Sequence, residues 1–222
     1  MKKQPQKRLP CLIFLAAIFL TFVSCAGISA DIQMRKNGSG RLTLEYRFSR
    51  MAETIGRLDG NERWQIIPAG RADWERTAAR TGGIKLVSFS GREDKNDIVN
   101  KVVLDFDNTG SLLKLLDPSG KRTVLNYSES KKQLNIIINE PVSAEINKDL
   151  LELARQVSAG YKFKLSFSAV GNSTLTLTDG SGNAINPPPG ANVVSSGKKV
   201  SLEIDTGEML RMSDGLGVSL GW

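Results

Sequence analysis

Residues 32–48 read IQMRKNGSGRLTLEYRF, and this stretch decides the fold. Within it, Leu42 and Leu44 alternate with polar residues, and the alternation continues through the aromatic positions 46 and 48. A period of two is typical of a strand with one buried face. Residues 37–40 (NGSG) tolerate positive φ, and residues 32–36 can pair with the strand that follows them. The stretch therefore predicts a β-hairpin.

The same alternation returns later in the chain, most clearly at residues 161–168, where Phe163, Leu165 and Phe167 share one face. Short turns between successive strands favour antiparallel pairing. Residues 179–194 contain three consecutive prolines, so we expect an extended loop there. Further strands are expected at residues 84–91, 98–106, 123–127, 134–139, 175–177, 200–204 and 218–222.

Apolar residues at helical spacing interrupt these strands. They predict helices at residues 49–58, 71–80 and 148–158, and a short helical turn at 111–116. The mixture indicates an α+β fold, in which a curved antiparallel β-sheet built from hairpins carries two or three helices packed on one face. No internal repeat divides the chain, so residues 31–222 are expected to form a single domain.

Residues 1–24 are typical of a lipoprotein signal peptide. Lys2, Lys3, Lys7 and Arg8 form a basic head, and residues 12–23 form an apolar run. A membrane-spanning helix needs about 20 apolar residues, so this shorter run indicates the core of a signal peptide. Its removal takes away four positive charges and lowers the net charge from +7 to about +3. That balance does not indicate nucleic-acid binding.

Cys25 follows the apolar run, between the small residues Ser24 and Ala26. We predict that Cys25 is the lipid attachment site, carrying palmitate-like acyl chains, and that residues 25–30 form a short tether. Phe22 replaces the Leu usual three residues before such a Cys, a looseness found in spirochaete-like lipoboxes. Ordinary secretion stays open as an alternative, because residues 28–30 (ISA) before Asp31 resemble a non-lipid cleavage site.

This layout resembles the LppM-like bacterial lipoproteins, which have a signal peptide with a Cys, an early hairpin, and then helices and further hairpins. The C-terminal part is the most similar, with residues 161–168 followed by TLTDGSGN at 176–183 and by residues 200–204 and 209–222. The resemblance implies binding of cell-envelope glycolipids. One member of that family carries a C-terminal transmembrane helix, and residues 209–222 do not contain one.

We expect no enzymatic activity, no cofactor and no metal. The chain has no His, the commonest general base and metal ligand. The turn at residues 179–183 lacks the acidic density of a calcium loop, and we interpret it as a polar turn. Asp105, Asp107 and Asn108 are interpreted as a solvated strand end. Four lysines are interpreted as part of a solvated sheet face, where lysine protects the sheet edge, with a lipid-facing basic patch as the alternative: Lys162, Lys164, Lys198 and Lys199.

The expected function is that of an envelope lipoprotein of a bacterial cell membrane or outer membrane, facing the periplasm or the exterior. Such a protein would bind a lipid, another amphiphile or a partner protein. A wide apolar sheet face beneath few helices can leave an apolar cavity, which is a usual ligand site. Three alternatives stay open: a surface-exposed structural or antigenic lipoprotein, a carboxylate-type hydrolase, and a small outer-membrane barrel suggested by the alternating residues 216–222.

Overall fold

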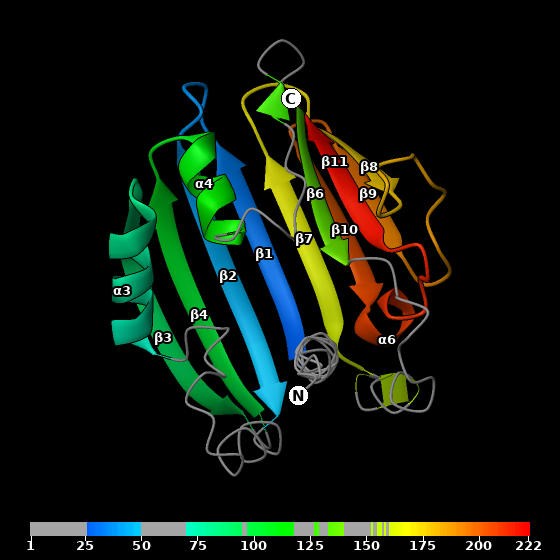
Figure 1. The fold of residues 1–222 in the computed structure, drawn as a ribbon, viewed down its shortest axis with the longest axis horizontal. Coiled ribbons are helices and arrows are strands. Elements are labelled where there is room, and N and C mark those ends of the chain that lie inside the picture. The colour runs from blue at the N-terminus through cyan, green and yellow to red at the C-terminus, as the bar shows by residue number, and fades with distance from the viewer. Residues whose placement is uncertain are drawn as a thin grey trace, which may run out of the picture.

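A computed structural model describes residues 26–49, 70–94, 97–117, 127–128, 133–139, 152, 155–156, 158 and 160–222. Within these residues the strands form a wide sheet and a small sheet (Figure 1). The wide sheet contains β1 (Ala26–Met34), β2 (Gly40–Ser49), β3 (Ile84–Asp94), β4 (Asp97–Phe106), β7 (Lys162–Ser168), β9 (Asn192–Ser196) and β10 (Lys199–Asp205). The small sheet contains β5 (Tyr127–Ser128), β6 (Gln133–Asn139), β8 (Thr174–Thr178) and β11 (Leu216–Gly221).

The first hairpin is confirmed, and it is longer than the sequence predicts. β1 and β2 pair antiparallel from Ala26 opposite Phe48 to Met34 opposite Gly40. The turn between them is closed by a hydrogen bond from the Arg35 amide to the Ser39 carbonyl, at 2.7 Å. Gly38 lies in this turn at a φ of 82°, a conformation that favours glycine.

The wide sheet is mixed, so the expectation of a purely antiparallel sheet is wrong. Its strand order is β3-β4-β2-β1-β7-β10-β9, and β1 pairs with β7 in parallel. The parallel pair joins two strands that are far apart in the sequence, with Ile28 opposite Phe163 and Ile32 opposite Phe167. β1 is thereby the middle strand, and it joins the β3-β4-β2 part of the sheet to the β7-β10-β9 part (Figure 1).

One apolar core joins the two sheets. The small sheet has the order β5-β6-β11-β8, and its central strand β11 contributes Val218 and Leu220, both fully buried. These side chains belong to the same cluster as Leu42 and Phe167 of the wide sheet. Phe167 also packs against the C-terminal Trp222, with ring centroids 5.4 Å apart. Residues 218–222, expected as a closing strand, therefore lie in the second sheet.

Two of the expected helices are confirmed. α3 (Arg71–Thr81) is joined to β2 by Trp74, whose indole N–H donates to the buried Tyr46 hydroxyl at 3.1 Å. Burial is the main cause that raises the pKa of Tyr46. α4 (Thr109–Leu116) is capped by Asn108, whose side chain accepts from the Ser111 amide at 2.9 Å. Leu112 of α4 is fully buried in the core.

The other predicted elements are described only in part. Of the helix expected at 49–58, Ser49 instead ends β2, and residues 50–58 lie outside the described residues, as do residues 123–126 of an expected strand. Of the helix expected at 148–158, the residues that are described (152, 155, 156 and 158) are helical. A short helix that the sequence did not indicate, α6 (Thr206–Met209), follows β10 and is capped by Asp205. The loop expected at 179–194 ends earlier, because β9 begins at Asn192.

Candidate functional site

The predicted tether is part of the sheet. Cys25 lies outside the described residues, but β1 begins at the next residue, Ala26. Residues 26–30 pair with residues 44–48 of β2, and residues 28–30 also pair with residues 163–165 of β7. Ile28 and Ala30 are half-buried and pack against the core. The expectation of a five-residue tether is therefore wrong, because these residues complete the central strand.

The apolar face that was expected to line a ligand cavity is packed. Leu42 and Phe167 have no exposed surface and Leu165 is buried, while Leu44 and Phe163 are half-buried against the same core. Residues of the small sheet fill the space above them, in the same core cluster. The described residues therefore form a packed interior, and they do not supply the walls of an apolar cavity between the layers.

The opposite face of the wide sheet is polar across its strands. Each strand alternates, so Thr43, Asp31 and Ser166 lie in one row across β2, β1 and β7. A parallel row nearer the β1–β2 turn runs from β3 to β10 through Lys85, Asp105, Arg41, Gln33, Ser168 and Lys199. This face is named the polar face, and it carries Gln33, Arg41, Glu203 and the lysines of β7 and β10.

The four lysines do not form one basic patch. Lys162 and Lys164 both form ion pairs with Glu203 of β10, the second at 2.9 Å. Lys199 lies four residues from Glu203 along β10, and it forms an ion pair with Asp31 at 3.6 Å. These three lysines lie on a solvated polar face, as expected, and are compensated by carboxylates. They do not protect a sheet edge, because β7 and β10 are interior strands of the wide sheet.

The carboxylate of Glu203 contributes to the stability of the folded domain in acid. Its hydrogen bonds with Lys162 and Lys164 lower the pKa of Glu203 to about 2. A carboxylate with a lowered pKa stabilises the folded state above its ordinary pKa, and this contribution is lost as the pH falls toward 2. We expect Glu203→Gln to flatten the loss of stability between about pH 4.5 and pH 2, measured by urea unfolding at several pH values. The effect should stay within about 1 kcal/mol, because solvent screens this half-exposed cluster.

Glu45→Gln is the matched control for that prediction. Glu45 lies in the same row of the polar face as Glu203, and it forms no ion pair with any described residue. Its substitution removes the same charge without breaking a pair. An equal change of slope in both variants would show that general charge, and not the lysine pairs, sets the acid stability.

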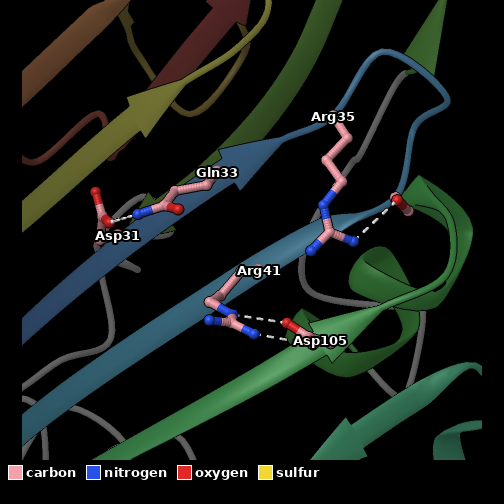
Figure 2. A network of polar contacts seen from close by, with 6 residues as sticks. Asp31, Gln33, Arg35, Arg41 and Asp105 are labelled. Atoms are coloured by element: carbon pink, nitrogen blue, oxygen red, sulfur yellow. Dashed lines mark hydrogen bonds and ion pairs between the residues drawn. The ribbon is translucent and has the colours of Figure 1, made fainter. Parts of the chain in front are cut away.

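A depression of about 270 Å³ lies on the polar face at the end of the first hairpin. Gln33, Met34 and Arg35 line it from the end of β1, and Arg41 lines it from the start of β2. Figure 2 shows the polar side chains of this region, including Asp31 and Asp105. The amide nitrogen of Gln33 donates to Asp31 at 2.8 Å, so these two side chains form one side of the region.

The Arg41–Asp105 pair forms the other side of the depression. The guanidinium donates two hydrogen bonds to the carboxylate, Nε at 2.7 Å and Nη2 at 3.1 Å. This bidentate contact raises the pKa of Arg41, and it is the main cause that lowers the pKa of Asp105. Arg35 and Lys85 lie close enough to Asp105 to lower its pKa further. Asp105 is thus an ion-pair partner rather than only a solvated strand end.

Arg35 is the uncompensated cation of this group. Its side chain is exposed, and its hydrogen bond to the Ser39 hydroxyl is long, at 3.5 Å. No carboxylate among the described residues lies within ion-pair distance of it. The depression therefore combines one paired arginine with one arginine whose donors are available.

Two other groups of residues that could suggest chemistry have structural roles. Both carboxylate oxygens of Asp179 accept hydrogen bonds within its own turn, from the Ser181 and Asn183 amides and from the Asn183 side chain. These bonds lower the pKa of Asp179. The residue organises a polar turn, as expected.

The part of the chain that is described contains no group of acidic residues arranged for a metal ion.

The sequence also contains GVSLG at residues 217–221, which matches the Gly-x-Ser-x-Gly pattern of hydrolase nucleophiles. That motif requires a sharp strand-to-helix turn, whereas these five residues lie within the regular strand β11. The Ser219 hydroxyl accepts a hydrogen bond from Gln133 of β6, and the chain has no His to activate it. The match to the pattern therefore does not indicate that Ser219 is a catalytic nucleophile.

No protein-family model matches this chain, and no curated protein matches it significantly. The resemblance to LppM-like lipoproteins thus remains a prediction from the layout of the sequence. Among the described residues, no helix is both long and apolar enough to cross a membrane.

The depression was not predicted from the sequence. The sequence does indicate that Gln33, Arg35 and Arg41 lie on one face, because they alternate with the apolar residues of the hairpin. The partner Asp105 could not be found in this way. Its position beside Arg41 depends on the pairing of β2 with β4, which are 64 residues apart at this point.

Proposed function

We propose that this chain is an exported bacterial lipoprotein of LppM-like type, cleaved before Cys25 and anchored in the envelope membrane through acyl chains on that residue. Its folded part would face the periplasm or the exterior and act by binding, without catalysis. The observation that carries the proposal is that residues 26–30 belong to β1, where they pair with β2 and, from residue 28, with β7.

The alternative cleavage site is poorly compatible with this fold. Cleavage after Ala30 would remove five of the nine residues of β1, the central strand of the wide sheet. Cleavage before Cys25 keeps every described residue of β1 in the mature chain. This difference supports lipid processing over ordinary secretion.

The fold also bears on what is bound. We infer that α3 and α4 cover the same face of the wide sheet as the small sheet, as Figure 1 suggests, and that the polar face is left for a partner. Since the described interior is packed, a buried acyl chain has little support. A polar ligand, such as the head group of an envelope amphiphile or a partner protein, fits the exposed face better.

Metabolic labelling with radioactive palmitate tests the anchor. The full-length gene product, expressed in a bacterium with a lipoprotein pathway, should incorporate label and sediment with membranes. We expect Cys25→Ala to lose both properties, because no other thiol follows the leader. Cys11→Ala is the matched control and should behave as the parent chain, because position 11 lies within the leader. Undiminished labelling of the Cys25→Ala variant would contradict the proposal.

A further inference from the structure

The depression at the end of the first hairpin has an excess of positive charge. Arg35 and Arg41 line the depression, and Lys85 of β3 lies beside it in register with Asp105 of β4, the single carboxylate that these three cations surround. Three cations and one anion leave a local charge of +2. The neighbouring Asp31 does not offset this excess, because it faces Lys199 at 3.6 Å.

We infer that this depression is a binding site for a phosphoryl group. Its local charge matches that of a phosphate dianion, and its lining contains Gln33, Arg35 and Arg41 beside the buried Met34. Arginine guanidinium groups present several N–H donors in one plane, which suits the oxygen atoms of a phosphate.

The geometry gives each side chain a separate role. Asp105 holds Arg41 through Nε and Nη2, which orients its guanidinium beside the depression. Arg35 lies across from this pair at the end of β1, bound only weakly to Ser39 (Figure 2). Arg35 can therefore turn its donors to a ligand without breaking an ion pair to any described carboxylate. A volume of about 270 Å³ has room for a phosphoryl group and for the part of the ligand that bears it.

The position of the site makes it independent of the anchor. Ala26 and Met34 are at opposite ends of β1, about 26 Å apart at the usual rise of a strand. The phosphoryl group could belong to a free metabolite or polymer, or to a phospholipid head group. The chemistry is shared by these sources, and the inference holds whether or not Cys25 carries lipid.

Binding of inorganic phosphate, followed by ³¹P NMR, tests this inference. The full-length gene product, purified in a non-ionic detergent, should broaden and shift the phosphate resonance in a saturable manner. Arg35→Gln should weaken this binding about tenfold, the size expected for loss of a charge-assisted contact. Arg92→Gln is the matched control, because Arg92 is an exposed arginine of β3 placed toward the other end of the sheet. It should leave phosphate binding unchanged.

Asp105→Asn provides an opposite change at the same site. It removes the negative charge that opposes the ligand, so phosphate binding should become tighter. A decrease equal to that of Arg35→Gln would instead show that the intact pair is the ligand-binding element, and would overturn the charge argument. Equal weakening by Arg35→Gln and Arg92→Gln would also overturn the site, because it would mean non-specific attraction.

Vesicles distinguish the source of the phosphoryl group. Sedimentation with phosphatidylglycerol vesicles that depends on Arg35 would assign the site to a lipid head group. Phosphate binding without Arg35-dependent vesicle binding would assign it to a free ligand. No saturable binding of phosphate and no Arg35-dependent vesicle binding would contradict the inference, and would leave the proposed lipid anchor untouched.

Discussion

A chain that begins at Asp31 should fail to form a stable domain. Removal of residues 26–30 deletes more than half of β1, and it exposes the edges of both β2 and β7. Ile28 and Ala30 also leave the core that they help to cover. We expect a loss of about 5 kcal/mol or more from these hydrogen bonds and this apolar surface. Since domains are stable by only about 5–15 kcal/mol, most molecules should unfold or aggregate.

Urea unfolding followed by circular dichroism measures this effect. The matched control is a chain that begins at Ala26, which keeps every described residue of β1. It should unfold at the same urea concentration as a chain that begins at residue 25. If the chain beginning at Asp31 were as stable as this control, β1 would not need residues 26–30, and the structural argument against cleavage after Ala30 would fail.

Gly40→Ala should cost about 3 kcal/mol of stability, toward the upper end of what overpacking of a buried site usually costs. Gly40 begins β2 and is buried between the neighbouring strands. A β-carbon there would lie 2.2 Å from the Gln33 carbonyl oxygen and 2.4 Å from the ring of Phe106. Neither neighbour can move easily, because the first belongs to the paired backbone of β1 and the second is buried. Thermal unfolding should shift down by roughly 6–12 °C.

Gly27→Ala is the control for the close approach at Gly40. Gly27 lies on the same hairpin, but a β-carbon there would meet its nearest atoms at 3.5 Å or more, which is ordinary contact. Its stability should change by less than about 0.5 kcal/mol, as for most substitutions without a steric conflict. Equal destabilisation by the two variants would show that glycine in the hairpin, and not the contact with Phe106, determines the effect.

The strands with clear alternation could be predicted from the sequence because burial of one face imposes a period of two. This held for the first hairpin and for residues 161–168, in which Leu42 and Phe167 face the core as expected. The period does not say which strand lies beside which. The parallel pairing of β1 with β7, and the division of the strands into two sheets, depend on contacts between distant segments.

The strand at residues 26–30 could not be predicted from local sequence preference either. Their sequence is AGISA, in which Ile28 is the one residue of high β-propensity and the others are small. Strand propensity depends strongly on neighbours, and here two flanking strands supply them. A short segment after a predicted signal peptide is therefore easily mistaken for a tether.

The most direct test of the lipoprotein assignment is the intact mass of the mature protein, with tandem fragmentation of its N-terminal peptide. The account predicts a chain that begins at Cys25, heavier than its amino-acid sequence by a diacylglycerol group and fatty acyl chains. A mature chain that begins at Asp31, or one that keeps residues 1–24 and carries no added mass, would contradict it.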